Sequence, residues 1–212
     1  GHDAVALAKA IGLRDAVGVG HSLGGNQLTR AASMLPEAFS TLLLIDPVIF
    51  AKDWYRLDDY DASTHFTMQR RNQWRNADEM FERFKGRGPF ANWDLAVLRD
   101  YCQYGLLPDP ARPEAGFVLA CSPEAEANVY TSACLRQNID IYAHIAKVRQ
   151  PVQVLRCTKV AENTQDLNAS PTTPDLASHF VNGLDVPLPP NYSHFIPMED
   201  PALVAHHVSA ES

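Results

Sequence analysis

The stretch Gly20-His21-Ser22-Leu23-Gly24-Gly25 decides how the rest of this chain is interpreted. It follows the apolar run 15–20 and precedes the helix-like stretch 26–35, so the sequence predicts a strand, a sharp turn with Ser22 at its apex, and a helix. Small residues two positions on either side of the serine are expected because side chains there would clash with the flanking strand and helix. Ser22 is therefore the candidate nucleophile. The backbone N–H of Leu23, at the start of the helix, is the candidate oxyanion donor.

A serine hydroxyl becomes a good nucleophile when a base takes its proton, and the chain contains eight histidines. His194 lies in the polar loop 191–200, directly before the amphipathic segment 201–208. A loop just beyond a strand end can deliver its side chain to the same sheet edge that carries Ser22. His194 is therefore the candidate base.

The other seven histidines lack this context. His206 and His207 fall within the predicted terminal helix, where they are expected to be solvated. His21 neighbours the nucleophile, but its side chain is expected to point away from the turn. Four further histidines belong to no motif: His2, His65, His144 and His179.

The turn at Ser22, the strand that ends Leu44-Ile45-Asp46-Pro47 and the segment 193–201 together resemble the α/β-hydrolase superfamily. The chain order serine, acid, histidine also fits that family. The resemblance implies an α/β fold with a mostly parallel sheet, of which the C-terminal half is present. It implies core parts at 1–51 and 148–212.

The resemblance also implies that residues 52–147 form an inserted helical cap. Within it, the stretches 70–74, 88–93 and 104–107 are similar to a subgroup that includes fungal peroxisomal lipase-like hydrolases. The segment contains most of the aromatic residues, and we expect most of these to form the cap's own core. A minority are expected to face the cleft, because a lid over a serine site buries an apolar substrate and excludes water.

The acid that would orient His194 has three candidates. Asp46 ends the strand after the nucleophile helix, where haloalkane dehalogenase-like relatives place their acid. Many other relatives place it a few residues after the strand that here spans 151–157, and there the candidates are Glu162 and Asp166. The favoured candidate is Asp46. The acid's role would be to hold the imidazole in one tautomer and to stabilise its protonated form.

Composition excludes several other classes of function. Hydrophobic residues make up 46% of the 212 residues, enough for a core, and the formal net charge of −7 argues against nucleic-acid binding. The four cysteines form no C-x-x-C pair and no metal-ligand spacing, so no metal or cofactor is expected. Their pattern favours a reducing compartment, cytoplasmic or peroxisomal. No apolar run approaches the length of about 18 residues that a membrane span requires.

The chain begins with an amphipathic segment, 4–11, shortly before the strand that leads to Ser22. The resemblance implies several earlier strands and a second oxyanion donor in a loop after one of them. A sheet that begins at its central strand would leave a long apolar edge exposed. We therefore expect an N-terminal half of the fold, on the same chain or on another.

These observations predict a serine hydrolase that cleaves a carboxylic ester of a hydrophobic small molecule or lipid through an acyl-enzyme. Two alternatives stay open. The same residues can hydrolyse a lactone or a carbon–carbon bond, and a non-catalytic member of the family can use the same pocket to bind a small molecule.

Overall fold

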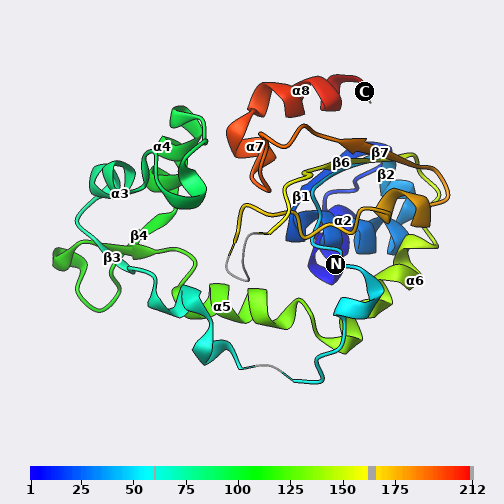
Figure 1. Ribbon diagram of the computed structural model, residues 1–212. Helices are drawn as coiled ribbons and strands as arrows, with labels where there is room; N and C mark the ends of the chain where they lie inside the picture. The colour runs from blue at the N-terminus through cyan, green and yellow to red at the C-terminus, as the bar shows by residue number, and fades with distance from the viewer. Residues whose placement is uncertain (60, 162–165, 211–212) are drawn as a thin grey trace. The chain divides into compact units, whose positions relative to one another are not determined.

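The computed structural model describes residues 1–59, 61–161 and 166–210 (Figure 1). The chain divides into two compact units. The core unit consists of Gly1–Arg56 and Arg136–Ser212, and the inserted unit consists of Leu57–Leu135.

The core unit alternates between strands and helices, as the predicted fold class requires. The strands at 16–21, 39–45 and 152–156 fall on the apolar runs that the sequence analysis selected. The α-helices and strands of this unit are α1 (His2–Ala10), β1 (Ala16–His21), α2 (Leu23–Met34), β2 (Phe39–Ile45), α6 (Ile141–Ile145), β6 (Val152–Arg156), β7 (Gly183–Pro187), α7 (Ile196–Glu199) and α8 (Pro201–Ala210). Short 3₁₀ helices lie at Pro36–Ala38, Lys52–Trp54, Arg136–Asp140 and Leu176–His179.

One parallel sheet organises the core unit. Its order is β1-β2-β6-β7, and each neighbouring pair is parallel, which confirms the mostly parallel sheet. The last residue of β1, His21, is paired with Ile45 of β2, and Ile45 is paired with Leu155 of β6. The carboxyl ends of these three strands therefore meet at one edge of the sheet, which is where Ser22 and Asp46 follow.

Strand β2 is buried on both of its faces. Leu42, Leu43, Leu44 and Ile45 are at most 1% exposed, the continuous apolar pattern of a strand inside a covered parallel sheet. Leu42 and Leu44 pack in one cluster with residues of α2 and α6, whereas Leu43 and Ile45 pack in another with residues of α7 and α8. Figure 1 shows α2 and α8 on opposite sides of the sheet.

The inserted unit is shorter than the expected segment 52–147. Residues 136–147 belong to the core unit, because α6 contributes Ile141 and Ile145, both fully buried, to the cluster that contains Leu42. The Tyr142 hydroxyl also donates a hydrogen bond of 2.8 Å to the backbone carbonyl of Phe50.

The inserted unit is not purely helical. Besides its helices it contains a three-stranded antiparallel sheet in the order β3-β5-β4. The helical expectation missed these strands because each spans two or three residues, too few for an alternating pattern to stand out. The unit's α-helices and strands are β3 (Gln73–Trp74), α3 (Ala77–Phe84), α4 (Leu95–Tyr104), β4 (Leu106–Pro108), β5 (Phe117–Leu119) and α5 (Pro123–Ser132). Its 3₁₀ helices are Ala62–Thr64, Phe66–Gln69, Gly88–Phe90 and Pro113–Ala115.

Side-chain caps start the three helices of the inserted unit. The side chains of Asn76, Asp94 and Ser122 each accept a hydrogen bond from a backbone N–H in the first turn of α3, α4 and α5. Such caps satisfy N–H groups that have no partner within the helix. The rings of Phe84, Phe90, Trp93 and Tyr101 contact one another, and among these four Trp93 is buried.

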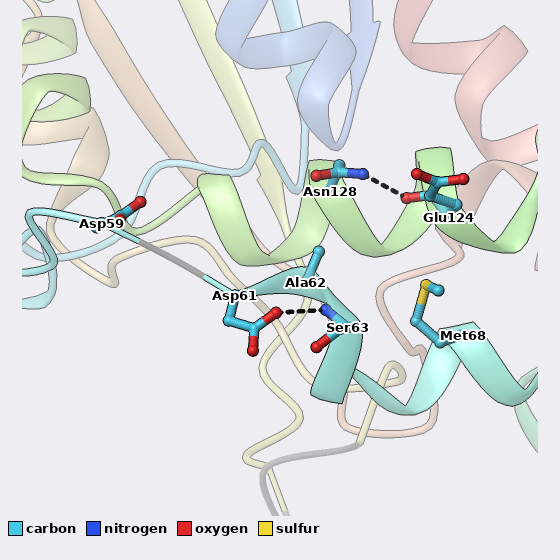
Figure 2. Close-up of a pocket in the computed structure, with 7 residues that line it drawn as sticks. All are labelled: Asp59, Asp61, Ala62, Ser63, Met68, Glu124 and Asn128. Carbon is cyan, nitrogen blue, oxygen red and sulfur yellow. Dashed lines mark hydrogen bonds between the residues drawn. The ribbon is translucent and has the colours of Figure 1, made fainter.

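A pocket of about 460 Å³ lies within the inserted unit (Figure 2). Its lining is largely polar: Asp61 accepts a hydrogen bond from the backbone N–H of Ser63, and Asn128 donates one to the backbone carbonyl of Glu124. The lining residues are Asp59, Asp61, Ala62, Ser63, Met68, Glu124 and Asn128. None of the candidate site residues belongs to this set.

Within the described residues, no helix combines the length and apolar character needed to cross a membrane.

Replacing Ile141 by alanine should destabilise the core unit by about 2–5 kcal/mol, because it leaves a cavity in the cluster between α6 and the sheet. Chemical denaturation of the purified protein measures this loss. Ile139, which is 39% exposed, is the matched control, and its alanine variant should stay within about 0.5 kcal/mol of the wild type. Equal effects at the two positions would contradict the placement of α6 in the core unit.

Candidate active site

Ser22 alone forms the turn between β1 and α2. Its backbone has φ +57° and ψ −127°, a region that a residue with a side chain adopts only when its surroundings hold it there. The backbone N–H of Ser22 donates to the carbonyl of Ile45 at 3.0 Å. Its carbonyl accepts from the N–H groups of Gly25 and Val48, both at 3.0 Å. The neighbouring strand β2 and the segment after it thus support the strained turn.

The glycines of the turn have different reasons to be there. A Cβ on Gly20 would lie 2.8 Å from the carbonyl oxygen of Gly24, and one on Gly25 would lie 2.7 Å from Cβ of Pro47. A Cβ on Gly24 would meet nothing within 4 Å. The expectation of a clash two positions before Ser22 is correct, but two positions after it the expectation is wrong. The crowded position on that side is Gly25, where the first turn of α2 crosses the segment after β2.

The side chains of Ser22, His194 and Asp46 form a continuous hydrogen-bonded series. Nε2 of His194 lies 2.9 Å from Oγ of Ser22, and Nδ1 lies 2.7 Å from Oδ2 of Asp46. A carboxylate only accepts hydrogen bonds, so Nδ1 carries the proton and Nε2 accepts from the serine hydroxyl. The structure therefore brings together three of the residues that the sequence singled out, from three separate parts of the chain.

Asp46 is fully buried, and its carboxylate is well supplied with donors. Oδ1 accepts from the backbone N–H of Cys157 at 3.0 Å and from the Ser170 hydroxyl at 2.6 Å, while Oδ2 accepts from His194. A buried carboxylate is tolerated when donors of this kind replace its lost water. Asp46 itself has φ +41°, so a second strained residue lies at this edge of the sheet. Sequence reasoning did not identify Ser170.

Asp166, another candidate acid, does not occupy this position. The Asp166 carboxylate accepts a hydrogen bond of 3.0 Å from the backbone N–H of Asn168, while the acid at Nδ1 of His194 is Asp46. Glu162 lies outside the residues that the structure describes.

The loop that carries His194 is held on both sides of that residue. The Ser193 hydroxyl and N–H both donate to the Glu199 carboxylate, at 2.6 and 2.9 Å, and the Tyr192 hydroxyl donates to Asp200 at 2.8 Å. The backbone N–H of His194 donates to the carbonyl of Asn168 at 2.9 Å. These contacts fix the backbone of the loop on both sides of His194.

The expectation for His21 is wrong, because its side chain lies against His194. Nε2 of His21 is 2.8 Å from the backbone carbonyl oxygen of His194, and the two ring centroids are 4.9 Å apart. Burial, followed by the neighbouring imidazole, lowers the pKa of His21 to about 4. The two residues are 173 positions apart in the sequence, and no local pattern carries a signal of that contact. On α8, His206 is exposed, in line with the expectation for it, whereas His207 is half-buried.

Leu23 begins α2, directly after Ser22. The first N–H groups of a helix have no partner within the helix, and they lie at the positive end of its dipole. The first turn of α2 contains no acidic side chain that would compete for an anion.

Cys157 lies next to the loop that carries His194. Burial raises the pKa of the Cys157 thiol to about 11, and its Sγ lies 3.4 Å from the carbonyl oxygen of Tyr192. It is therefore a buried, protonated thiol next to the His194 loop. The described residues contain no cluster of three or more His, Cys, Asp or Glu side chains arranged to hold a metal ion.

A family model described as "Alpha/beta hydrolase family" matches residues 2–207. The chain belongs to the alpha/beta hydrolase family. The parallel sheet, the serine turn and the late histidine of this alpha/beta hydrolase chain agree with that membership.

Two fungal proteins are similar in sequence to this alpha/beta hydrolase chain. A type I acyl-CoA thioesterase, mpaH, of Penicillium roqueforti is 31% identical over 141 residues, which is 65% of this chain and 32% of that protein. The abhydrolase domain-containing protein AKT2 of Alternaria alternata is 32% identical over 93 residues, which is 44% of this chain and 34% of that protein. The matched part is thus about a third of the length of each relative.

Solved structures share the fold. The peroxisomal alpha-beta-hydrolase Lpx1 of Saccharomyces cerevisiae superposes with a TM-score of 0.70 at 16% identity, covering 92% of this chain and 51% of Lpx1. A thioesterase domain from the curacin biosynthetic pathway superposes with a TM-score of 0.67 at 13% identity, covering 97% of this chain and 71% of that domain. At these identities the likeness concerns the fold alone.

Replacing Gly25 by alanine should destabilise the protein by about 1–3 kcal/mol, since the new methyl group requires Pro47 and the turn to shift. Replacing Gly24, where a Cβ finds open space, is the matched control. Because alanine is the better helix former, Gly24→Ala should be neutral or slightly stabilising. Urea denaturation of both variants checks this. A Gly24 variant that loses as much stability as the Gly25 variant would contradict the assignment.

Proposed function

We propose that this chain carries the catalytic residues of a serine hydrolase that transfers a hydrophobic acyl group to water through an acyl-enzyme. The observation that carries the proposal is the series Ser22 Oγ, His194 and Asp46, joined at 2.9 and 2.7 Å. This arrangement activates a serine hydroxyl and orients the base that receives its proton.

The substrate class in the proposal is a carboxylic ester or a thioester. An ester of an apolar acid is the substrate that the sequence favours. A thioester is included because proteins with sequence or fold likeness to this chain are named an acyl-CoA thioesterase and a thioesterase domain. Both substrates present the same acyl carbonyl, and they differ in whether an alcohol or a thiol leaves.

In the first half of the proposed reaction, Ser22 Oγ attacks the substrate carbonyl carbon while its proton passes to Nε2 of His194. The carbonyl oxygen becomes an oxyanion, to which the N–H of Leu23 donates. The tetrahedral intermediate collapses, the bond to the leaving oxygen or sulfur breaks, and the imidazolium protonates that atom. Asp46 stays ionised throughout and stabilises the imidazolium.

In the second half, water attacks the acyl-enzyme. His194 takes a proton from the water, the bond between the acyl carbon and Ser22 Oγ breaks, and the proton returns to the serine. The products are a carboxylic acid and the regenerated hydroxyl. No cofactor takes part in these steps.

A second oxyanion donor is part of the proposal, and we place it outside this chain, in an N-terminal half of the fold. Oxyanion sites for acyl transfer are commonly formed by more than one donor, and Leu23 N–H supplies one. In the described residues, β1 has a hydrogen-bonded strand on one side only, so a further strand could pair with its other edge. Experiments on activity therefore use the full-length protein.

The inserted unit is proposed to act as a cap that binds the apolar part of the substrate. Three of its side chains, Leu95, Tyr104 and Leu107, are more than half exposed. Exposed apolar side chains on an inserted unit suit a surface that covers a hydrophobic acyl group.

Ser22 should react with a fluorophosphonate probe, because such probes phosphonylate serine hydroxyls that a base activates. Intact mass and peptide mapping of the full-length protein should show one adduct, on Ser22. The adduct should disappear in Ser22→Ala. Ser178→Ala is the matched control, since it removes a hydroxyl that bonds the carbonyl of Asp175 outside the site, and it should keep the adduct on Ser22.

An ester and thioester panel then identifies the leaving group and the acyl chain. A folded, full-length wild type that forms no adduct would overturn the serine hydrolase proposal and favour a non-catalytic binding protein. An adduct on Ser22 without turnover of any ester or thioester would instead favour a lactone or a carbon–carbon bond as substrate.

Asp46→Asn should lower kcat by about 10⁴-fold, because an amide at this position favours the wrong tautomer of His194. The matched control is Asp166→Asn, a change of the same chemistry at the nearby carboxylate that accepts from Asn168, and it should leave kcat within about twofold of the wild type. Steady-state kinetics on the best substrate of the panel measures both. A larger loss for Asp166→Asn than for Asp46→Asn would contradict the choice of acid.

A further inference from the structure

Two consecutive residues, the last of β1 and the one in the turn after it, contact the same histidine. Ser22 bonds the imidazole of His194 at Nε2, and the preceding residue, His21, bonds the backbone carbonyl of His194 at 2.8 Å. The first of these hydrogen bonds is the one that the proposed reaction breaks and re-forms. The second does not involve any reacting atom.

The direction of the second hydrogen bond follows from its acceptor. A backbone carbonyl only accepts, so Nε2 of His21 carries the proton and donates it. A neutral imidazole has one N–H, hence Nδ1 of His21 carries the lone pair. The charged and titratable groups with an electrostatic influence on His21 are His194 and Asp46. His21 is thus a neutral donor whose one N–H is used to hold the loop.

We propose that His21 is a positioning residue that sets the distance between Ser22 and the imidazole of His194 by tying the histidine loop to the end of β1. This inference rests on the proposed serine hydrolase function. It assigns His21 a role that acts through His194 and not through contact with the substrate.

The other hydrogen bonds of the histidine loop show why the hydrogen bond from His21 matters. Tyr192 and Ser193 bond Asp200 and Glu199, so these contacts fix the loop relative to its own continuation. The N–H of His194 bonds Asn168, which lies in the segment between β6 and β7. The hydrogen bond of His21 joins the loop directly to β1, the strand that ends at the nucleophile.

The ring of His21 also supports the imidazole through packing. Its centroid lies 4.9 Å from that of His194, with the ring planes inclined by 34°. Loss of the donor would let the carbonyl of His194, and the imidazole with it, move away from Ser22. Misplacement of a catalytic group by about 1 Å can cost about 10²-fold in rate.

The experiment compares His21→Leu with His21→Gln in the full-length protein. Leucine fills similar space without a donor, whereas glutamine offers an amide N–H at a similar reach from the backbone. The matched control is His179→Leu, which removes an imidazole that bonds Asp175, a residue outside the site. Kinetics of hydrolysis, the rate of fluorophosphonate labelling at Ser22 and the melting temperature are measured for each variant.

His21→Leu is expected to lower kcat and the labelling rate by about 10- to 100-fold with KM within about twofold, because geometry and not binding is lost. His21→Gln should recover most of that loss, and His179→Leu should behave as the wild type. If His21→Leu does not fold, His21→Asn replaces it, since its shorter amide does not reach the carbonyl.

A donor-free variant that folds and labels Ser22 at the wild-type rate would overturn the inference while leaving the serine hydrolase proposal intact. Equal losses in His21→Leu and His21→Gln would also overturn it, because they would show that bulk and not the hydrogen bond matters. A wild type that never labels Ser22 would overturn the proposed function itself, and the positioning role with it.

Discussion

The rest of the site depends on one buried charge, the carboxylate of Asp46. It is fully buried, and a carboxylate in such surroundings is stable only if donors replace the water it has lost. Its three donors come from three different segments: Cys157 at the end of β6, Ser170 in the segment between β6 and β7, and His194 beyond β7. Hydrogen bonds to this carboxylate therefore hold three segments of the second half of the core unit against the end of β2. The imidazole is oriented because it is one of these donors.

Parallel pairing explains why Asp46 and Ser22 are close enough to share one histidine. His21 pairs with Ile45, and Ile45 with Leu155, so the residues that follow β1 and β2 leave the sheet at the same level. Two of them, Ser22 and Asp46, adopt positive φ, which costs of order 1–3 kcal/mol at each residue. The backbone bonds from Ser22 to Ile45 and from Asp46 to Leu155 hold both residues in place. In these backbone conformations both side chains bond the imidazole of His194.

The features that the sequence predicted well are those encoded within a few residues. The strand, turn and helix around Ser22 were predictable because apolar runs and glycines act locally, and His194 because its loop follows a strand. Asp46 was favoured as the acid only by resemblance to relatives, with Glu162 and Asp166 left open, because spacing along the chain carries no information on which carboxylate faces Nδ1. His21 and Ser170 were missed for the same reason, since their contacts join positions more than a hundred residues apart. The small antiparallel sheet was missed because its strands are too short to show a period.

The position of Asp46 directly after β2 has a mechanical consequence. Ile45 and Asp46 are consecutive, and the carbonyl of Ile45 accepts from the N–H of Ser22 while the Asp46 carboxylate accepts from His194. The backbone acceptor for Ser22 and the carboxylate acceptor for His194 thus lie on one dipeptide at the end of the buried strand β2. A displacement of β2 would move both acceptors together, so it would alter the distance between Ser22 and His194 less than a displacement of the histidine loop alone. The distance between Ser22 and His194 is therefore most sensitive to movement of the loop. The hydrogen bond from His21 to the carbonyl of His194 holds that loop where it meets β1.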